Sequence, residues 1–208
     1  LMNDGQSVKR GAVLAWIRGD ASVLLQGERV ALNLLQRMCG VATLTAAFAK
    51  EVEGTRSVVV DTRKTTPGLR VLEKYSVRMG GGGNHRMALY DAVLIKENHV
   101  AAAGGITAAV SRAQQRVPHT QKIEVEVRNQ EEVAEALAAG ADILLLDNMS
   151  LDELSAAVEL VGDRAITEAS GGVNLESVRA IAETGVRLIS VGALTHSYRS
   201  VDISMLFT

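Results

Sequence analysis

The sequence contains few aromatic residues, two prolines and a single cysteine, Cys39, in 208 residues. One cysteine excludes an internal disulfide framework, so we expect a reducing compartment, the cytoplasm. Cys39 lies in a helix-like apolar stretch and is predicted to pack in the core rather than act as a nucleophile. No apolar run approaches about 18 residues, so we expect neither a membrane span nor a membrane partner. The net charge of -2 gives no electrostatic case for binding nucleic acid.

The remaining composition is that of an α/β protein: 47% of the residues are hydrophobic and 19 are glycine. Apolar runs predict strands at 56–61, 91–96, 122–127, 142–147, 165–168 and 187–192. Helical spacing predicts helices after most of them, at 67–77, 105–116, 130–139, 151–161 and 175–184. Strands that are apolar at every position, such as 143–146, indicate a parallel sheet covered by helices.

The helix ends carry local signals. Asn129 with Glu132, and Ser150 with Glu153, have the spacing of capping boxes. Three glycines are placed where helices are expected to stop, namely Gly140, Gly162 and Gly185. Before the repeating units, residues 12–25 show a hairpin-like signal around Gly19-Asp20, and residues 28–52 predict one long helix or two joined near Gly40.

Both a doubly wound open sheet and a (β/α) barrel fit this pattern. An open sheet gathers its ligand groups at one switch point, whereas a barrel collects them from the ends of many strands. Here polar residues follow nearly every strand: Asp61, Arg63, Lys64, Lys96, Asn98, His99, Glu124, Glu126, Asp147, Asn148, Glu168 and Ser170. This distribution favours a barrel, and six readable strands instead of eight predict an open or incomplete one.

The strand at 56–61 leads directly into Asp61, Arg63 and Lys64. Burying such charges at the end of a core strand costs several kcal/mol unless partners compensate them. Further cations follow it, and His85 lies beside them: Arg70, Arg86 and Lys96. An excess of positive groups near one pocket indicates a polyanionic substrate, although surface ion pairing explains any one of them, Arg70 above all.

Acidic residues mark two neighbouring strands. The strand period of two places Lys122, Glu124 and Glu126 on one face, with Glu126 nearest the mouth of a barrel; an exposed edge strand is the alternative. Asp147 ends a fully apolar strand. Glu126 and Asp147 together suit a divalent cation bound through water, or the hydroxyls of a sugar.

Glycine-rich segments suggest phosphate binding. Gly80–Gly83 resembles an anion-binding nest, and a mobile loop is an equal interpretation. Ser170-Gly171-Gly172 and Val191-Gly192-Ala193 follow the last two strands, where barrel enzymes often bind phosphate. The residues thus predict a phosphorylated sugar or nucleotide precursor charged at both ends.

The ordered set of motifs resembles the quinolinate phosphoribosyltransferase family over essentially the whole chain. These motifs are 28–33 (ERVALN), 61–70 (DTRKTTPGLR), 74–86 (KYSVRMGGGGNHR), 96–99 (KENH), 124–126 (EVE), 146–148 (LDN), 169–172 (ASGG) and 191–196 (VGALTH). The resemblance implies transfer of phosphoribose from 5-phosphoribosyl-1-pyrophosphate to quinolinate, with decarboxylation, giving nicotinate mononucleotide, pyrophosphate and CO2. Mg²⁺ accompanies the pyrophosphate substrate, and no organic cofactor is expected.

The resemblance also implies an architecture: the open α/β barrel of type II phosphoribosyltransferases with a remnant of an N-terminal α/β sandwich domain. We assign residues 1–28 to this remnant, 29–195 to the barrel and 196–208 to a C-terminal segment returning toward the N-terminal domain. A homodimer or hexamer is expected, in which Arg29 reaches the neighbouring subunit's site.

Site residues follow from the matching motif positions. Lys64, Lys96, Glu126 and Asp147 are the implied catalytic residues, and Glu126 with Asp147 is the indirect Mg²⁺ site. The implied substrate-binding set is Arg29, Thr62, Arg63, Lys64, His85, Arg86, Lys96, Glu126, Asp147, Ser170, Gly171, Gly172, Val191, Gly192 and Ala193. The cations would bind the quinolinate carboxylates and phosphate-bearing groups, and the acids would bind ribose hydroxyls and Mg-pyrophosphate. Ser170, Gly171, Gly172 and Gly192 would hold the 5-phosphate.

Two departures from the family pattern stand out. Position 39 is Cys where the family usually has Ser, from which we expect only a small packing change. Most of the sandwich domain is not in the sequence, so we expect exposed apolar surface and low activity. The alternatives are a related phosphoribosyltransferase for nicotinate or another aromatic acid, and an inactive fragment.

Overall fold

The computed structural model describes residues 2–207 and contains one parallel sheet of six strands. The strands are β1 (Val58–Val60), β2 (Val93–Ile95), β3 (Ile123–Val127), β4 (Ile143–Asp147), β5 (Ile166–Ser170) and β6 (Leu188–Ser190). Their order is β1-β6-β5-β4-β3-β2, so β1 and β2 are the two edge strands and the sheet does not close. All six predicted strands are present, and the predicted open barrel is confirmed.

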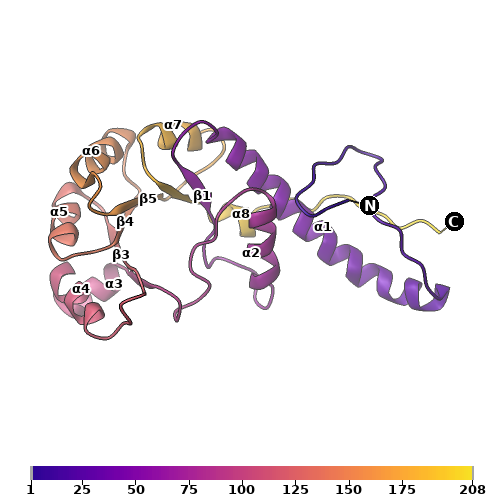
Figure 1. Cartoon of the computed structure of the whole chain (residues 1–208), viewed down its shortest axis with the longest axis horizontal. Helices are drawn as coiled ribbons and strands as arrows, with labels where there is room; N and C mark the ends of the chain where they lie inside the picture. The colour runs from indigo at the N-terminus through magenta and orange to yellow at the C-terminus, as the bar shows by residue number, and fades with distance from the viewer. Residues whose placement is uncertain (1, 208) are drawn as a thin grey trace.

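Helices follow the strands and lie in an arc outside the curved sheet (Figure 1). They are α1 (Ala21–Glu51), α2 (Arg70–Met79), α3 (Glu97–Ala103), α4 (Ile106–Gln114), α5 (Gln130–Ala138), α6 (Leu151–Val161), α7 (Val178–Glu183) and α8 (Ala193–His196). The sequence did not predict α3 and α8. In α3 the imidazole of His99 accepts the backbone N–H of Lys96 at 2.9 Å, so a polar strand end also starts a helix.

Strand register separates the two faces of the sheet. The convex face carries the apolar residues that pack against the helices, among them Val59, Val125, Leu144, Leu146 and Ile189. The other positions of each strand point to the concave face. They include Glu124, Glu126, Asp147, Glu168, Ser170 and Ser190. Alternation along each strand therefore places acids and hydroxyls inside the open barrel.

The helix α1 runs without a break from residue 21 to 51, so the hairpin predicted at 12–25 is wrong. Asp20 caps the helix instead, because its carboxylate accepts the backbone N–H of Ser22 at 2.9 Å. The segment 2–20 has turns but no strand. The boundary predicted between residues 28 and 29 stays a prediction and lies inside this helix.

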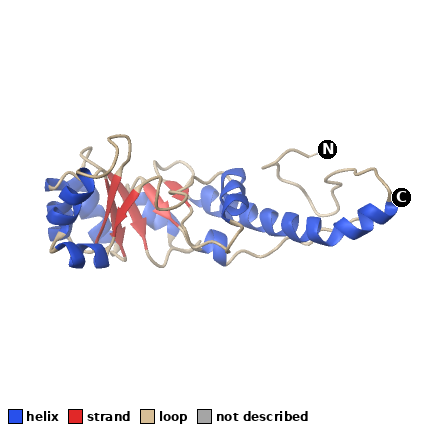
Figure 2. Cartoon of the chain, turned by 90° about the horizontal axis from the view of Figure 1, so that it is seen from below, coloured by secondary structure: helices blue, strands red, loops and turns tan. Residues whose placement is uncertain are grey.

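The first half of α1 projects beyond the barrel (Figure 2), while its second half packs against β1, α2, α7 and α8. By length and composition alone α1 is apolar enough to cross a membrane, a property shared by core helices. Exposed apolar side chains gather on it and on the chain termini: Val8, Val13, Trp16, Ile17, Val23, Leu25, Val30, Leu206 and Phe207. The expectation of exposed apolar surface is met.

Cys39 is partly buried on α1. Burial first, and the charge of Asp4 second, raise the pKa of its thiol. A raised pKa disfavours the thiolate, which agrees with a packing role.

The predicted helix ends are largely confirmed. Ser150 and Glu153 form a reciprocal capping box. Asn129 accepts the N–H of Glu132 at 2.9 Å, but the Glu132 carboxylate bonds the N–H of Arg128 instead of closing the box. Gly140 and Gly185 adopt φ values of 84° and 88° after their helices.

The C-terminal segment returns along α1. The backbone N–H of Val201 donates to the carbonyl of Gln36 at 3.1 Å, and the Gln36 amide donates to the carbonyl of Ile203 at 2.7 Å. The two segments lie close together at Gly40, where an added Cβ would clash with the carbonyl of Arg199. Glycine at position 40 therefore permits this crossing.

We predict that Gly40→Ala lowers the free energy of unfolding by about 1–3 kcal/mol, because the backbone of Arg199 must move. Gly27→Ala is the matched control, since it lies in the same helix with nothing within 4 Å of the new methyl group. That control should be neutral or more stable by about 0.5–1 kcal/mol. Denaturant titration of both variants measures the difference, and equal stabilities would contradict the close crossing.

Candidate functional site

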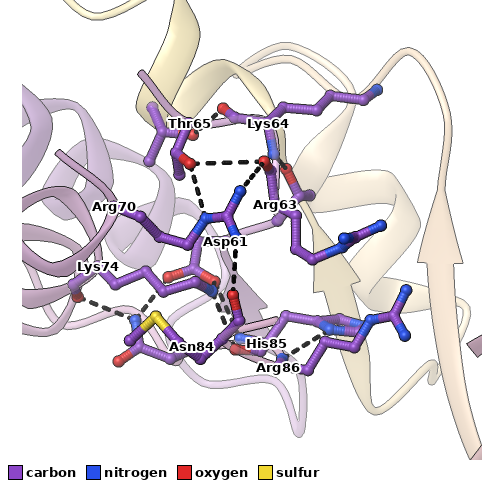
Figure 3. Close-up of polar contacts among 12 residues, drawn as sticks. Asp61, Arg63, Lys64, Thr65, Arg70, Lys74, Asn84, His85 and Arg86 are labelled. Atoms are coloured by element: carbon purple, nitrogen blue, oxygen red, sulfur yellow. Dashed lines mark hydrogen bonds and ion pairs between the residues drawn. The ribbon is translucent and has the colours of Figure 1, made fainter. Parts of the chain in front are cut away.

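The strand ends on the concave side are organised by a buried ion pair. Lys74 of α2 and Asp61, which follows β1, form a salt bridge with side chains that are 2% and 0% exposed. Asp61 also accepts the backbone N–H of His85 at 2.9 Å, and Lys74 donates to the carbonyl of His85 at the same distance. Asn84 donates to both Asp61 and the carbonyl of Lys74. One ion pair thus holds the end of β1, α2 and loop 84–86 together (Figure 3).

A second network fixes the loop between β1 and α2. The carboxylate of Glu73, 1% exposed, accepts the guanidinium of Arg37 and the backbone N–H of Thr66 at 3.0 Å. The guanidinium of Arg70 donates to the Thr65 hydroxyl at 2.9 Å and to the carbonyl of Met87 at 3.0 Å. Arg70 therefore connects two loops. Within residues 2–207 it forms no salt bridge, so the surface ion pair considered for it is wrong.

Four predicted cations occupy this end of the barrel: Arg63, Lys64, Arg86 and Lys96. Figure 3 shows the side chains of Arg63, Lys64 and Arg86 extending to the same side. Burial first, and the charge of Arg63 next, lower the pKa of Arg86. The Nε of Arg86 is buried without a hydrogen-bond partner. Neighbouring cations with unused donors form a site suited to an anion.

The two predicted acids lie on adjacent strands of the concave face. Glu126 accepts the ammonium of Lys96 at 2.6 Å, and the carboxylate of Asp147 accepts the Asn148 amide at 2.8 Å. Lys122 lies at the other end of β3, where it pairs with Asp142 at 3.3 Å. The edge-strand alternative for β3 is wrong, because β3 pairs with both β2 and β4.

His85 lies between the loop and the sheet. Its Nδ1 accepts the backbone N–H of Arg86 at 2.7 Å, and its Nε2 lies 3.0 Å from Glu124 and 3.6 Å from Glu168. Both ring nitrogens are thus engaged within the protein, and the role of His85 as a ligand of the substrate stays a prediction. The sequence placed Glu124 and Glu168 at strand ends but gave them no role.

The loops after β5 and β6 complete the mouth. Gly171 and Gly172 have φ values of 100° and 60°, and a Cβ at Gly171 would clash with the amide of Asn148. Asn148 itself has φ 54°, the one described non-glycine residue with positive φ. Its backbone N–H donates to the carbonyl of Ser170 at 2.9 Å, so it connects the ends of β4 and β5. The sequence placed Asn148 at a strand end but gave it no role. Gly192 lies against the side chain of Lys64, which brings the β6 loop next to the cations.

Gly80–Gly83 is not a phosphate nest. Backbone carbonyls accept all four of its N–H groups, including that of Gly83, which donates to Val59 at 2.8 Å. Side chains at Gly80 and Gly82 would clash with α1, and Gly83 bridges to β1. These glycines permit close packing of the chain beneath α1.

The remaining predicted residues are placed as follows. Thr62 accepts the backbone N–H of Lys64 at 3.0 Å, and Val191 donates its backbone N–H to Val60 at 2.9 Å. Ala193 begins α8. Arg29 lies in the first half of α1, the half that projects beyond the barrel (Figure 2); its side chain is 69% exposed, with Glu28 at 3.9 Å as its acidic neighbour.

Comparison with known proteins identifies the family of this site. Residues 41–206 match the C-terminal domain of quinolinate phosphoribosyl transferase, and residues 1–39 match its N-terminal domain. The probable nicotinate-nucleotide pyrophosphorylase (carboxylating) of Bacillus subtilis is 50% identical over 97% of this chain and 70% of the relative. The Synechocystis protein of the same name is 47% identical over 99% and 70%. The crystal structure of NadC from Streptococcus pyogenes superposes with a TM-score of 0.95 at 42% identity, covering 99% of this chain and 72% of that one.

The buried ion pair yields a prediction. Lys74→Met should lower the free energy of unfolding by about 3–5 kcal/mol, because Asp61 is left charged without its partner. Lys122→Met is the matched control, since it removes a Lys–Asp pair whose lysine is 59% exposed; it should cost about 0–1 kcal/mol. Chemical denaturation of both variants tests this, and a small loss for Lys74→Met would show that the pair is dispensable.

Proposed function

The chain belongs to the quinolinate phosphoribosyltransferase family, and from this premise we propose that its concave site transfers phosphoribose to quinolinate. The second substrate is 5-phosphoribosyl-1-pyrophosphate, and the products are nicotinate mononucleotide, pyrophosphate and CO2. The observation that carries the proposal is that Arg63, Lys64, Arg86 and Lys96 share one end of the sheet with Glu126 and Asp147, where Lys96 pairs with Glu126. Relatives named for the carboxylating pyrophosphorylase reaction support it.

The cations provide the subsite for the aromatic acid. Quinolinate carries two carboxylates, and the forked guanidinium groups of Arg63 and Arg86 can each bind one carboxylate in a defined orientation. Such binding directs the ring nitrogen toward C1 of the ribose. Fixing this approach supplies much of the catalytic effect, because it removes the orientational cost of a bimolecular reaction.

The acids act on the ribose donor. When pyrophosphate leaves C1, positive charge develops on the sugar, and the carboxylates of Glu126 and Asp147 stabilise it electrostatically. Lys96 holds Glu126 in place through the 2.6 Å contact. The ring nitrogen then forms the bond to C1, which leaves a pyridinium.

Decarboxylation follows from the chemistry of that ring. The pyridinium accepts the electron pair released when the adjacent carboxylate leaves as CO2, and the vacated ring carbon takes up a proton. This step uses the substrate as its own electron sink, so the proposal includes no organic cofactor.

Mg²⁺ fits the two acids. Mg²⁺ prefers one or two protein carboxylates together with substrate phosphates and water, and Glu126 and Asp147 offer carboxylate oxygens on adjacent strands of one face. Bound there with pyrophosphate, the ion would neutralise charge on the leaving group. Asn148 orients Asp147 for this role through its 2.8 Å hydrogen bond.

The 5-phosphate is assigned to the last two strand loops. Ser170, Gly171 and Gly172 follow β5, and Val191, Gly192 and Ala193 lead into α8. Lys64 lies against Gly192, which would place its ammonium between this subsite and the pyrophosphate. The supporting observation is the backbone left open by glycine, to which an anion can approach closely.

Assembly completes the proposal. We infer a homodimer, or dimers forming a hexamer, because Arg29 is exposed on the half of α1 that projects beyond the barrel and a twofold interface can deliver it to the partner's site. A cytoplasmic location remains part of the proposal, supported by the single free cysteine.

Turnover with quinolinate, compared with nicotinate, tests the function. Release of CO2 and formation of nicotinate mononucleotide only with quinolinate is the expected result. Turnover of nicotinate without CO2 would indicate the related enzyme, and binding of neither acid would overturn the proposal.

We predict that Lys96→Ala lowers kcat/KM at least about a hundredfold, since one lost electrostatic contact at a site of developing charge costs roughly 3 kcal/mol. Lys122→Ala, on the same side of the sheet at the opposite end of β3, is the control and should leave the kinetics unchanged. Steady-state kinetics decide between them, and a Lys96→Ala enzyme with wild-type rates would remove Lys96 from the site.

Action of Arg29 in trans predicts complementation. Homodimers of Arg29→Ala and of Lys96→Ala should both be inactive, whereas a mixed dimer regains one intact site of two. Mixing the inactive variants and assaying turnover measures this gain. If Arg29 acts in cis, both sites of this mixed dimer stay damaged and no activity returns. The Arg29→Ala and Lys96→Ala double variant mixed with wild type is the complementary test. In trans that second mixture has no intact site, and in cis it keeps one.

A further inference from the structure

Arg70 uses all three of its guanidinium nitrogens as hydrogen-bond donors within the protein. Nε donates to the Thr65 hydroxyl at 2.9 Å, Nη1 to the carbonyl of Met87 at 3.0 Å, and Nη2 to the carbonyl of Arg63 at 3.2 Å (Figure 3). The side chain is partly buried. A guanidinium that is fixed in three directions serves the surrounding backbone rather than a substrate.

The acceptors of Arg70 belong to two loops, and each loop carries one of the two guanidinium groups of the proposed acid subsite. Arg63 lies in the loop between β1 and α2, and its own carbonyl is one acceptor. Met87 directly follows Arg86 in the loop between α2 and β2. Arg70 therefore joins the backbone of one substrate-binding arginine to the backbone beside the other.

Arg63 and Arg86 belong to opposite edges of the open sheet. Arg63 follows the edge strand β1, whereas Arg86 donates to the carbonyl of Ala92, beside the edge strand β2, at 3.1 Å. Burial first, and the charge of Arg63 second, lower the pKa of Arg86, so the two guanidinium groups are close enough to repel each other. A constant distance between them therefore depends on contacts that cross the open edge, and Arg70 makes two of these.

We propose that Arg70 is a specificity-determining positioning residue: it sets the spacing of Arg63 and Arg86 so that the site selects an aromatic acid with two adjacent carboxylates. The inference rests on the proposed function, in which each of these two arginines binds one carboxylate. Two linked contacts strengthen binding only when the geometry allows both at once, so a fixed spacing favours the dicarboxylate. A monocarboxylate occupies one guanidinium group and does not depend on the distance to the other.

Binding of two non-reacting acids measures this selectivity. Phthalate has two adjacent carboxylates, benzoate has one, and both lack the ring nitrogen that attacks the ribose. For Arg70→Met we expect the dissociation constant of phthalate to rise about tenfold or more, while that of benzoate stays within about twofold of wild type. Arg70→Lys keeps the charge but has no planar fork to reach three acceptors, so it should lose the selectivity as well. Titration calorimetry measures all four constants.

Arg78→Met is the matched control. Arg78 lies in the last turn of the same helix, with its guanidinium 5.8 Å from the centre of the Tyr75 ring. This substitution removes an arginine from α2 while the contacts of Arg70 stay in place, so both acids should bind as in wild type. Equal weakening of both acids by Arg70→Met is the result expected of a merely structural role and would overturn the proposal, as would unchanged phthalate binding.

Limited proteolysis tests the connection between the loops without any acid. Trypsin cleaves after Arg63, Lys64 and Arg86, which lie in the two loops that Arg70 joins. These bonds should be cut at least about fivefold faster in Arg70→Met than in wild type, whereas cleavage after Lys122, at the other end of the sheet, should not change. Mass spectrometry identifies the fragments, and equal cleavage rates in both proteins would overturn the proposal.

Failure of the proposed function has a separate signature. Wild type would then bind phthalate no better than benzoate and would not turn over quinolinate, and the specificity role of Arg70 would be wrong with it. A wild type that prefers phthalate, together with an Arg70→Met variant that keeps this preference, would overturn the inference alone.

Discussion

The buried pair between Asp61 and Lys74 is the interaction on which the site depends. It takes two full charges out of water, which is tolerable only because Asn84 and the backbone of His85 supply further hydrogen bonds. Those bonds join the end of β1, one face of α2 and loop 84–86 into one unit. The side chains of Arg63, Lys64 and Arg86 extend from this unit. The buried contacts of the unit hold the backbone of these three cations in place although the cations repel one another.

An open barrel makes such anchoring necessary. In a closed barrel each strand is held by two neighbours, but β1 and β2 each have one. The chain between them is held instead by Gly83 against β1 and by His85 against β3 and β5. In a closed barrel, apolar side chains fill the interior. In this open barrel the concave face carries acids and hydroxyls, and the cations lie at the mouth.

Charge is distributed in layers from the sheet outward. Buried carboxylates lie deepest, His85 lies above Glu124, and the guanidinium and ammonium groups lie at the surface of the mouth. The imidazole of His85 connects the buried Glu124 to the backbone of Arg86 in the outer loop.

Local patterns in the sequence determined much of this molecule: the six strands, most helices, their caps, the open barrel and the polar strand ends that carry Glu126 and Asp147. Periodicity and capping act over a few residues, so they can be predicted from neighbours alone. Only the tertiary structure decided that Lys74 belongs to Asp61, that Glu168 faces Glu124 through His85, and that Gly80–Gly83 packs under α1 rather than binding phosphate. Strand order and register bring these groups together from distant positions, and which charge is buried against which partner depends on that arrangement rather than on any local pattern.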